Sequence, residues 1–252
     1  MSETSHRRVV IGDVHGHYEG LMLLLEKIAP TSEDQIYFLG DLIDRGPQSA
    51  QVVEFVRQNN YLCLLGNHEQ MLLNILTGRD KASANMQAWL YSGGQATVAS
   101  YQSAMIPQEH LDWFDSLPTY LDLGDFWLTH AGVNPNKTVE EQTADQLCWI
   151  REEFHSISKP YFPDKWIIVG HTITFTLPGV PPGNLAQGQG WIDIDTGAYH
   201  PRSGWLTGLD ITNKLVYQAN VFSRAVRTLT WEEAMTVVRP DDLSSRRHKQ
   251  QA

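Results

Sequence analysis

The sequence has few cysteines, no long apolar run and less basic than acidic charge. Only two of its 252 residues are cysteines, Cys63 and Cys148, and both lie in apolar segments. Two cysteines are too few for a disulfide framework, so a reducing environment fits best. No apolar stretch approaches the roughly 20 residues that a membrane-spanning helix needs, and residues 1–8 lack the apolar stretch of a signal peptide. We therefore expect a cytoplasmic protein with no membrane partner.

The shortage of basic charge limits the kinds of ligand. The chain has 19 Lys and Arg residues against 29 Asp and Glu residues, a formal net charge of −10, and it has ten histidines. Because nucleic-acid binding needs a basic surface, this balance argues against a nucleic-acid partner. A hydrophobic content of 42% and a charged content of 19% are ordinary for a globular chain and exclude wholesale disorder.

Strand-like and helix-like segments alternate in the first third of the chain. Short apolar runs that end in Gly followed by Asp or Asn predict strands, and apolar residues at helical spacing after each run predict helices. The predicted strands are Arg7–Asp13, Gln35–Asp41 and Tyr61–Asn67, and the predicted helices are Glu19–Ile28, Gln48–Gln58 and His68–Leu76. This alternation predicts a parallel sheet flanked by helices.

The rest of the chain is helix-like first and strand-like afterwards. Residues 80–118 are expected to be helical. Five later runs predict strands: Asp125–His130, Lys165–His171, Gly190–Asp195, Gly204–Ile211 and Lys214–Ala219. Together the two halves predict an α/β fold with two packed mixed β-sheets, a central β-sandwich, flanked by helices. We expect one domain over residues 1–240, a loop at Phe175–Gly190 because of its three prolines and four glycines, and a disordered tail at Asp241–Ala252.

Polar residues follow the ends of the first three predicted strands. Because the carboxyl ends of neighbouring parallel strands line one crevice, we expect these side chains to converge there: Asp13, His15, Asp41, Asp44, Asn67 and His68. Carboxylates that meet in a crevice repel one another unless a cation or a proton neutralises them. Oxygen and imidazole ligands together suit divalent manganese, iron or zinc. A single strand-end Asp usually caps a helix or turn, but three such strand ends favour a metal site.

These motifs resemble those of a known family. The segments GDVHG at 12–16, GDLIDRG at 40–46 and GNHE at 66–69 are similar to the phosphoprotein phosphatase type, the serine/threonine protein phosphatases, of the calcineurin-like metallophosphoesterases, in its bacterial and phage-like branch. Three later segments continue the resemblance: Leu128-Thr-His-Ala-Gly132, Val169-Gly-His-Thr172 and Ile194-Asp-Thr-Gly-Ala198. The resemblance covers about residues 9–211. It implies a metal-dependent phosphomonoester hydrolase in which a hydroxide that bridges two metals attacks the phosphoryl group.

The resemblance also implies a role for each matching residue. Two divalent cations, with manganese expected and iron or zinc as alternatives, would be held by a set of six side chains. In this set Asp13 and His15 bind the first ion, Asp41 bridges both, and Asn67, His130 and His171 bind the second. His68, oriented by Asp44, would donate a proton to the leaving oxygen. Arg45 would hold the phosphoryl oxygens, with Arg151 as a second clamp and Arg202 as an alternative to it.

Three functions remain open at this point. The presence of Asp44 and Glu69 in their motifs favours a serine/threonine protein phosphatase acting on phosphorylated proteins. A related branch hydrolyses diadenosine tetraphosphate symmetrically. That branch tends to lack an Asp at the position of Asp44 and to have Asp at the position of Glu69, so this chain fits it less well. Another small phosphoester is also a possible substrate. A catalytically inactive binding module is disfavoured because every expected ligand position is filled. The oligomeric state is left open.

Some features of the sequence have no role in the metallophosphoesterase interpretation. Four histidines outside the motifs are expected at the surface or in loops: His17, His110, His155 and His200. The segment Tyr91–Thr97 resembles a glycine pair of bacterial family members, for which the sequence suggests no mechanism. The loops Phe175–Gly190 and Tyr199–Trp205 are expected to form walls of the substrate groove.

Overall fold

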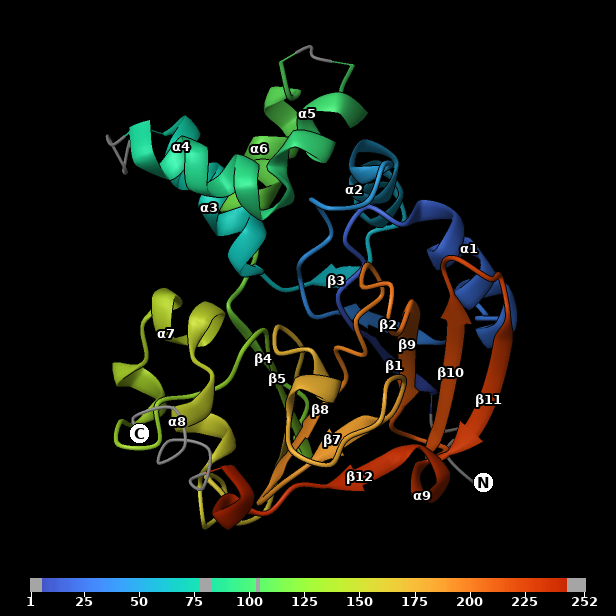
Figure 1. Cartoon of the computed structure of the whole chain (residues 1–252), viewed down its shortest axis with the longest axis vertical. Coiled ribbons are helices and arrows are strands. Elements are labelled where there is room, and N and C mark those ends of the chain that lie inside the picture. Colours follow the sequence, from blue (N-terminus) through green and yellow to red (C-terminus); the bar gives the residue numbers. More distant parts are fainter. Residues whose placement is uncertain (1–5, 78–82, 103–104, 244–252) are drawn as a thin grey trace.

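A computed structural model describes residues 6–77, 83–102 and 105–243 of the chain. It contains two six-stranded sheets of mixed direction (Figure 1). The first sheet has the order β11 (Val226–Thr230), β10 (Leu215–Asn220), β9 (Trp205–Asp210), β1 (Arg8–Ile11), β2 (Gln35–Phe38) and β3 (Leu62–Cys63). The second has the order β12 (Met235–Val237), β7 (Leu185–Gln187), β8 (Trp191–Asp193), β6 (Trp166–Val169), β5 (Phe126–Thr129) and β4 (Tyr120–Asp122). The predicted fold class, two mixed sheets flanked by helices, is confirmed.

Three neighbouring strands run parallel in each sheet, at one end of the first sheet and in the interior of the second. In the first sheet β1, β2 and β3 are parallel neighbours, and in the second β5, β6 and β8 are. Their outer neighbours β9 and β4 pair antiparallel with them. Because parallel strands all end at the same edge, each sheet presents three loops on one side. This arrangement positions the site described below.

Side chains of the central strands alternate between two cores. In β1, Val10 belongs to the apolar layer shared by both sheets, whereas Val9 and Ile11 pack with the helices outside the first sheet. In β6, Ile168 belongs to the shared layer and Ile167 to the core outside the second sheet. Successive residues of a strand point to opposite faces, and both faces are covered. These strands are therefore apolar at nearly every position, as is typical of buried parallel strands.

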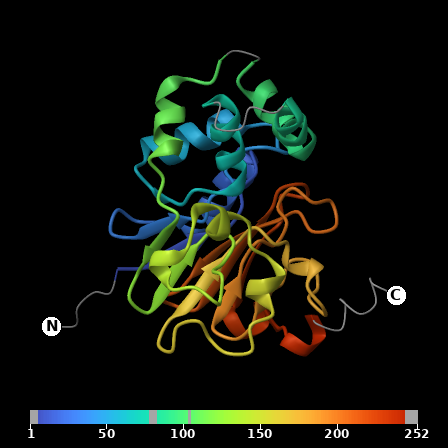
Figure 2. The ribbon, with the colours of Figure 1, turned by 90° about the vertical axis from the view of Figure 1, so that its left-hand side faces the viewer.

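Helices cover both outer faces. On the first sheet lie α1 (Tyr18–Ile28), α2 (Ser49–Gln58) and α3 (Asn67–Leu76), and four further helical segments follow: α4 (Ser83–Trp89), η1 (Leu90–Gly94), α5 (Gln95–Ser100) and α6 (Gln108–Asp115). Figures 1 and 2 show α3 to α6 gathered at one end of the molecule, beyond the sheets. On the second sheet lie the short helices α7 (Ala144–Trp149) and α8 (Glu152–His155). Three shorter segments complete the helices: η2 (Val139–Glu141), η3 (Thr174–Thr176) and α9 (Trp231–Ala234). Within the described ranges no helix has the length and apolarity to cross a membrane.

Two sequence predictions about irregular segments are wrong. Phe175–Gly190 is not only a loop, because it contains the end of η3 and strand β7, which pairs with β8 and β12. The apolar pair Leu185 and Ala186 is fully buried there, and this burial outweighs the prolines and glycines around it. The predicted tail Asp241–Ala252 begins too early, since residues 240–243 form a helical turn and Leu243 is buried in the core of the second sheet. The remainder of that tail, 244–252, lies outside the described residues.

An ion pair between Arg7 and Asp34 joins the start of β1 to the turn before β2, with Nη2 and Oδ2 2.6 Å apart. The hydrogen bond from Arg7 lowers the pKa of Asp34 below the ordinary carboxyl value. A carboxyl with a depressed folded-state pKa stabilises the fold above its unfolded-state pKa, and this contribution disappears as the pH falls through the lower folded-state value.

We predict that Asp34→Asn lowers the free energy of unfolding by about 0.5–1 kcal/mol at pH 7, and that the difference from the parent protein shrinks steadily as the pH is lowered below the ordinary carboxyl range. Urea unfolding over a series of pH values measures this. The control is Glu33→Gln, which removes the same charge from the exposed neighbouring residue. An equal loss in both variants, or a loss that does not shrink as the pH falls, would contradict the prediction.

Candidate functional site

The predicted site residues lie in the loops and helix starts that follow the six parallel strands. Asp13 and His15 follow β1, Asp41 follows β2, His130 follows β5 and His171 follows β6. In addition, Asp44 and Arg45 lie in the loop after β2, Asn67 and His68 begin α3, and Asp195 follows β8. The three parallel strands of each sheet thus contribute to one place. This convergence is what the strand-end motifs predict.

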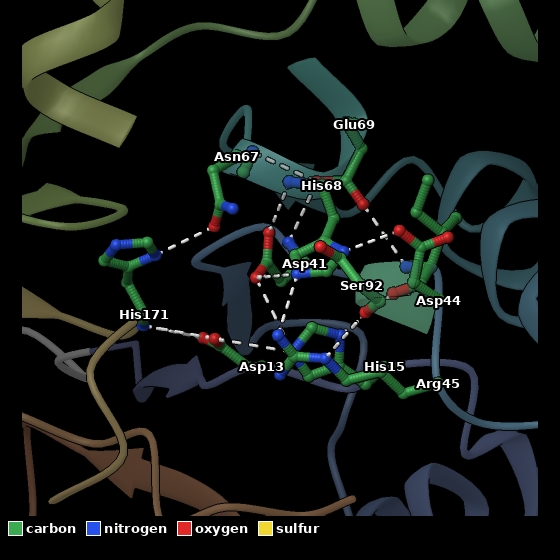
Figure 3. Close-up of polar contacts among 12 residues, drawn as sticks. Asp13, His15, Asp41, Asp44, Arg45, Asn67, His68, Glu69, Ser92 and His171 are labelled. Atoms are coloured by element: carbon green, nitrogen blue, oxygen red, sulfur yellow. Dashed lines mark hydrogen bonds and ion pairs between the residues drawn. The ribbon is translucent and has the colours of Figure 1, made fainter. Parts of the chain in front are cut away.

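Two groups of buried side chains meet at Asp41. One consists of His15, Asp41 and His68, the other of Asp41, His130 and His171, and within each group one ligand atom per residue lies within 4.8 Å of the others. Asn67 joins the second group, because its Oδ1 is 3.0 Å from His130 Nε2 and 2.8 Å from His171 Nδ1. Figure 3 shows Asp41 near the centre of the labelled side chains, with Asn67 and His171 on one side and Asp44 and Arg45 on the other.

Asp13 links the two sheets at this place. Its Oδ2 accepts a hydrogen bond of 3.1 Å from the backbone N–H of His171 and lies 4.0 Å from His15 Nε2. The structure therefore brings together all six residues predicted to bind metal. It also makes His68, predicted as the acid, a member of the first group.

The imidazoles are oriented as metal ligands. Nδ1 of His15 lies 2.9 Å from the carbonyl of Ile43, and Nδ1 of His130 lies 2.8 Å from that of Leu39. Each Nδ1 therefore donates, which leaves Nε2 aimed into the site. Burial lowers the pKa of His15, His130 and His171 and so favours the neutral ring that a metal binds. Among the described residues, the buried His171 Nε2 has no hydrogen-bond partner.

Burial raises the pKa of three carboxylates at the site. Burial first, and then the charges of Asp195 and Asp41, raise the pKa of Asp13 well above its ordinary value. Burial likewise raises the pKa of Asp195 to about 6, and burial followed by the charge of Asp195 raises that of Asp193. At Asp41 burial also acts to raise the pKa, but the four neighbouring histidines outweigh it, and its pKa lies below the ordinary value.

Divalent cations would relieve the repulsion among these carboxylates. The carboxylates, the imidazoles and the His171 nitrogen, which has no partner among the described residues, therefore fit a binuclear metal site. Such donors suit manganese, iron and zinc alike.

The backbone around the site adopts conformations that side chains rarely tolerate. Among the described residues, ten non-glycine residues have a positive φ, and half of them belong to the predicted site: His15, Asp41, Asp44, Arg45 and His171. Such conformations each cost of order 1–3 kcal/mol and persist only where surrounding contacts enforce them. Their concentration here indicates that the loops are held in place to aim these side chains.

Glu69 provides one of these contacts, and the sequence analysis assigned it no role in the site. Its buried carboxylate accepts backbone N–H groups from Asp41 (2.9 Å), Leu42 (2.8 Å), Ile43 (3.3 Å) and Gly66 (3.1 Å). It therefore fixes the loop that carries Asp41. A Cβ at Gly66 would clash with Asp41, so only glycine allows this close approach.

Arginine side chains lie at both groups. Arg45 places Nη1 2.9 Å from His15 Nε2 and Nη2 3.0 Å from His68 Nε2. Its guanidinium also lies 3.9 Å from the centre of the Tyr199 ring, so the loop Tyr199–Trp205 does reach the site. At the second group, Arg151 Nη1 donates to the His171 carbonyl at 3.2 Å. The alternative clamp, Arg202, instead lies over the ring of Phe175, 4.7 Å from its centre.

The segment Trp89–Thr97 holds Asp44, the partner of His68. Asp44 Oδ2 lies 2.6 Å from His68 Nδ1 and accepts the indole N–H of Trp89 at 2.9 Å. The Thr97 hydroxyl donates to Asp44 Oδ1 at 2.5 Å and also accepts the backbone N–H of Asp44 at 2.9 Å. Asp44 is completely buried, so these bonds fix its orientation and, through it, that of the His68 ring.

The glycine pair of this segment contacts Arg45. The Gly93 carbonyl accepts the backbone N–H of Arg45 at 3.1 Å, and the Ser92 carbonyl accepts its Nε–H at 3.3 Å. Gly93 has a φ of +119°, and a Cβ there would lie 2.6 Å from Arg45 Cγ. The motif for which the sequence suggests no mechanism therefore positions Asp44 and Arg45. Sequence spacing alone could not reveal this, because the two segments are about 50 residues apart.

Two of the histidines predicted at the surface are buried. His155 is 2% exposed, and its Nε2 lies 3.1 Å from Asp193 Oδ2, next to the carboxylates of the site. His110 is 4% exposed and lies between Tyr101 and Glu54, at 2.8 Å and 2.7 Å. Both predictions are wrong because each ring pairs with a residue that is distant in sequence.

Buried carboxylates and imidazoles meet at the joined strand ends of two sheets, and their donor atoms suit the metal centre of a metal-dependent enzyme. The model of the calcineurin-like phosphoesterase family matches residues 6–224. The chain belongs to this family.

Curated relatives match this chain over part of its length. The symmetrical bis(5'-nucleosyl)-tetraphosphatase of Vibrio campbellii is 29% identical over 171 residues, which make up 62% of this chain and 59% of the relative. The enzyme of the same name from Actinobacillus pleuropneumoniae is 32% identical over 140 residues, or 54% of this chain and 48% of the relative. The chain thus spans about half the length of the curated relatives it matches.

Solved structures share the fold over most of the chain. A candidate diadenosine tetraphosphatase superposes with a TM-score of 0.62 at 18% identity and covers 91% of this chain and 96% of its own. A serine/threonine phosphatase of Saccharomyces cerevisiae superposes with a TM-score of 0.58 at 18% identity and covers 91% of this chain and 81% of its own. At this identity the likeness shows the fold alone.

We predict that Asp41→Asn reduces the manganese bound per chain from about two ions to less than one, because Asp41 belongs to both groups of ligands. Elemental analysis after dialysis measures the content. The control is Asp112→Asn, an exposed carboxylate on α6, which should retain both ions. Retention of two ions by Asp41→Asn would refute the shared role.

We predict that Thr97→Val slows the hydrolysis of phenyl phosphate by roughly tenfold in kcat with unchanged metal content, because a loosened Asp44 no longer orients His68. Steady-state kinetics and elemental analysis measure the two quantities. Thr77→Val is the control, since the Thr77 hydroxyl donates to the Leu73 carbonyl at the end of α3. Equal kcat in the two variants would contradict the positioning of Asp44 by Thr97.

Proposed function

We propose that this phosphoesterase cleaves dinucleoside tetraphosphates symmetrically and releases two nucleoside diphosphates. The geometric observation that supports this is the placement of Arg45 at the first group of ligands and Arg151 at the second. A polyphosphate chain carries negative charge on several consecutive phosphates, and it could contact both arginines at once. The curated relatives named as symmetrical tetraphosphatases support the same substrate class. This substrate replaces the phosphorylated protein favoured by the motifs.

In the proposed reaction the six predicted ligands hold two divalent cations. When bound, such cations offset phosphoryl charge and lower the pKa of water to near neutrality. The guanidinium group of Arg45, which contacts the imidazoles of His15 and His68 in the structure, turns to the phosphoryl oxygens of the substrate. Arg151 binds the neighbouring phosphate. The buried loop around Asp41, fixed by Glu69, keeps this arrangement rigid during the reaction.

His68 acts as the proton donor to the leaving oxygen. Burial lowers its pKa, but the charge of Asp41 and the hydrogen bond to Asp44 raise it, so that its pKa lies above that of an ordinary histidine. The hydrogen bond from Nδ1 to Asp44 keeps the ring oriented with Nε2 toward the site. A donor so placed can protonate a departing oxygen.

The same histidine supports a second candidate, a serine/threonine protein phosphatase. A serine alkoxide is a strong base and needs a proton to leave, whereas a nucleoside diphosphate leaves readily as an anion. A buried, oriented acid such as the His68–Asp44 pair is therefore most useful for a phosphomonoester of an alcohol. The two candidates differ in product and in their dependence on His68.

We predict that the manganese-loaded protein converts diadenosine tetraphosphate to two molecules of ADP, without AMP or ATP, and faster than it dephosphorylates a phosphoserine peptide. Chromatography of the nucleotides and release of inorganic phosphate measure the two reactions. If the peptide is dephosphorylated and the dinucleotide stays intact, the second candidate replaces the first.

The matched variant for this experiment is His68→Asn. Loss of a general acid lowers the rate by about 10²–10⁴-fold where the leaving group needs a proton, so the peptide reaction should fall by that amount and p-nitrophenyl phosphate hydrolysis by much less. Equal losses on both substrates, or loss of metal, would mean that His68 is not the proton donor.

A further inference from the structure

A cavity of about 350 Å³ lies between α3, α4 and α7, beside the candidate site. The residues that matter for its chemistry are Gln70, Asn74, Asn85, Asp145 and Trp149. None of them has a role in the proposed reaction. Its volume is at the lower end of the range of small-ligand pockets, which is about 300–1,000 Å³.

Two structural features connect the cavity to the second group of ligands. Asn67, Gln70 and Asn74 lie on one face of α3, because residues three and seven positions apart in a helix share a face. At a rise of about 1.5 Å per residue, Asn74 lies about 10 Å along the helix axis from Asn67. From α7, the ring of Trp149 packs edge-on against His171 with the ring centres 6.2 Å apart. The cavity is therefore one to two helical turns from the phosphoryl site.

Trp149 presents a large aromatic surface that is held in place. The residue is 42% exposed, and its indole N–H donates to Gln70 Oε1 at 2.6 Å. Gln70 Nε2 in turn donates to Asp145 Oδ1 at 2.8 Å. An exposed indole would ordinarily be free to rotate, but this chain of hydrogen bonds fixes its plane. A fixed, exposed ring is suited to stacking on another flat ring.

The helices α3 and α4 offer hydrogen-bonding groups to the cavity. Asn74 on α3 and Asn85 on α4 both line it, and each amide can donate and accept at once. The edge of a nucleobase also carries donors and acceptors side by side. A flat ring with such an edge matches the cavity better than an extended peptide, which has no aromatic plane to stack.

We propose that this cavity binds a nucleobase, which stacks on Trp149 and directs its edge to Asn74 and Asn85. The proposal rests on the proposed dinucleoside tetraphosphate activity, because it places the base of one half of that substrate. The span of about 10 Å along α3 is one that a ribose and its phosphates can bridge. Trp149, Asn74 and Asn85 would then determine specificity without touching the reacting atoms.

The test compares two probes, AMP and ribose 5-phosphate, which share the sugar and phosphate and differ in the base. Calorimetric titration of the manganese-loaded protein should show tighter binding of AMP. In Trp149→Leu the affinity for AMP should fall roughly tenfold, while that for ribose 5-phosphate stays within about twofold. Asn74→Leu, whose side chain is remote from His171, should reduce the preference for AMP in the same direction.

The matched control is Trp166→Leu, which removes another partly exposed tryptophan at the far end of β6 and should leave the AMP preference unchanged. Equal binding of AMP and ribose 5-phosphate by the parent protein would overturn the proposal, as would an unchanged preference in Trp149→Leu. Because both probes contact the phosphate site, a variant that disturbs only that site weakens the binding of AMP and of ribose 5-phosphate equally.

Hydrolysis of diadenosine tetraphosphate is measured separately on the same samples. Hydrolysis without a preference for AMP means that the proposed function holds and the cavity is not a base site. A Trp149-dependent preference for AMP without hydrolysis means that the cavity binds a base and the proposed function is wrong. The two failures are thus distinguishable.

Discussion

The repulsion among buried carboxylates at the joined ends of two sheets is the constraint on which this structure depends. Asp13, Asp41, Asp193 and Asp195 are each at most 3% exposed, and burial deprives them of the water that would screen their charges. Imidazoles, the guanidinium groups of the arginines and, in the proposed holoenzyme, two divalent cations surround them. The arginines and the cations offset the carboxylate charge, and the imidazoles can ligate the cations.

To offset the carboxylate charges at short distance, the loops that carry the site residues must have a fixed shape. Positive φ angles at the predicted site residues turn side chains inward within very short loops, and these conformations need external support. Glu69 supplies it to the Asp41 loop through backbone N–H groups, and Thr97 supplies it to Asp44. The helical segments between α3 and α6 therefore serve the site as well as the core, because α4 carries Trp89 and α5 carries Thr97.

The predictions from sequence were most accurate where one strand end and the residues directly after it form a unit. Asp13, His15, Asp41, Asn67 and His68 belong to such units, and the structure brings them together as expected. Glu69, Trp89, Thr97 and Tyr199 act through partners from other segments, so no local pattern assigned them a role. The local motifs did not determine the substrate class either. The motifs with Asp44 and Glu69 favoured a protein phosphatase, whereas the curated relatives are named as tetraphosphatases.

The sequence by itself determined the α/β class, the parallel order of the first three strands and the set of donor side chains, because hydrophobic periodicity and strand-end motifs are local. Only the tertiary structure decided how Glu69 supports the Asp41 loop, how Asp44 is held and where Trp149 lies relative to His171. Those relations depend on how the second sheet and the helices pack onto the first sheet. Packing is a property of contacts between distant segments, and such contacts leave no periodic signal in the chain.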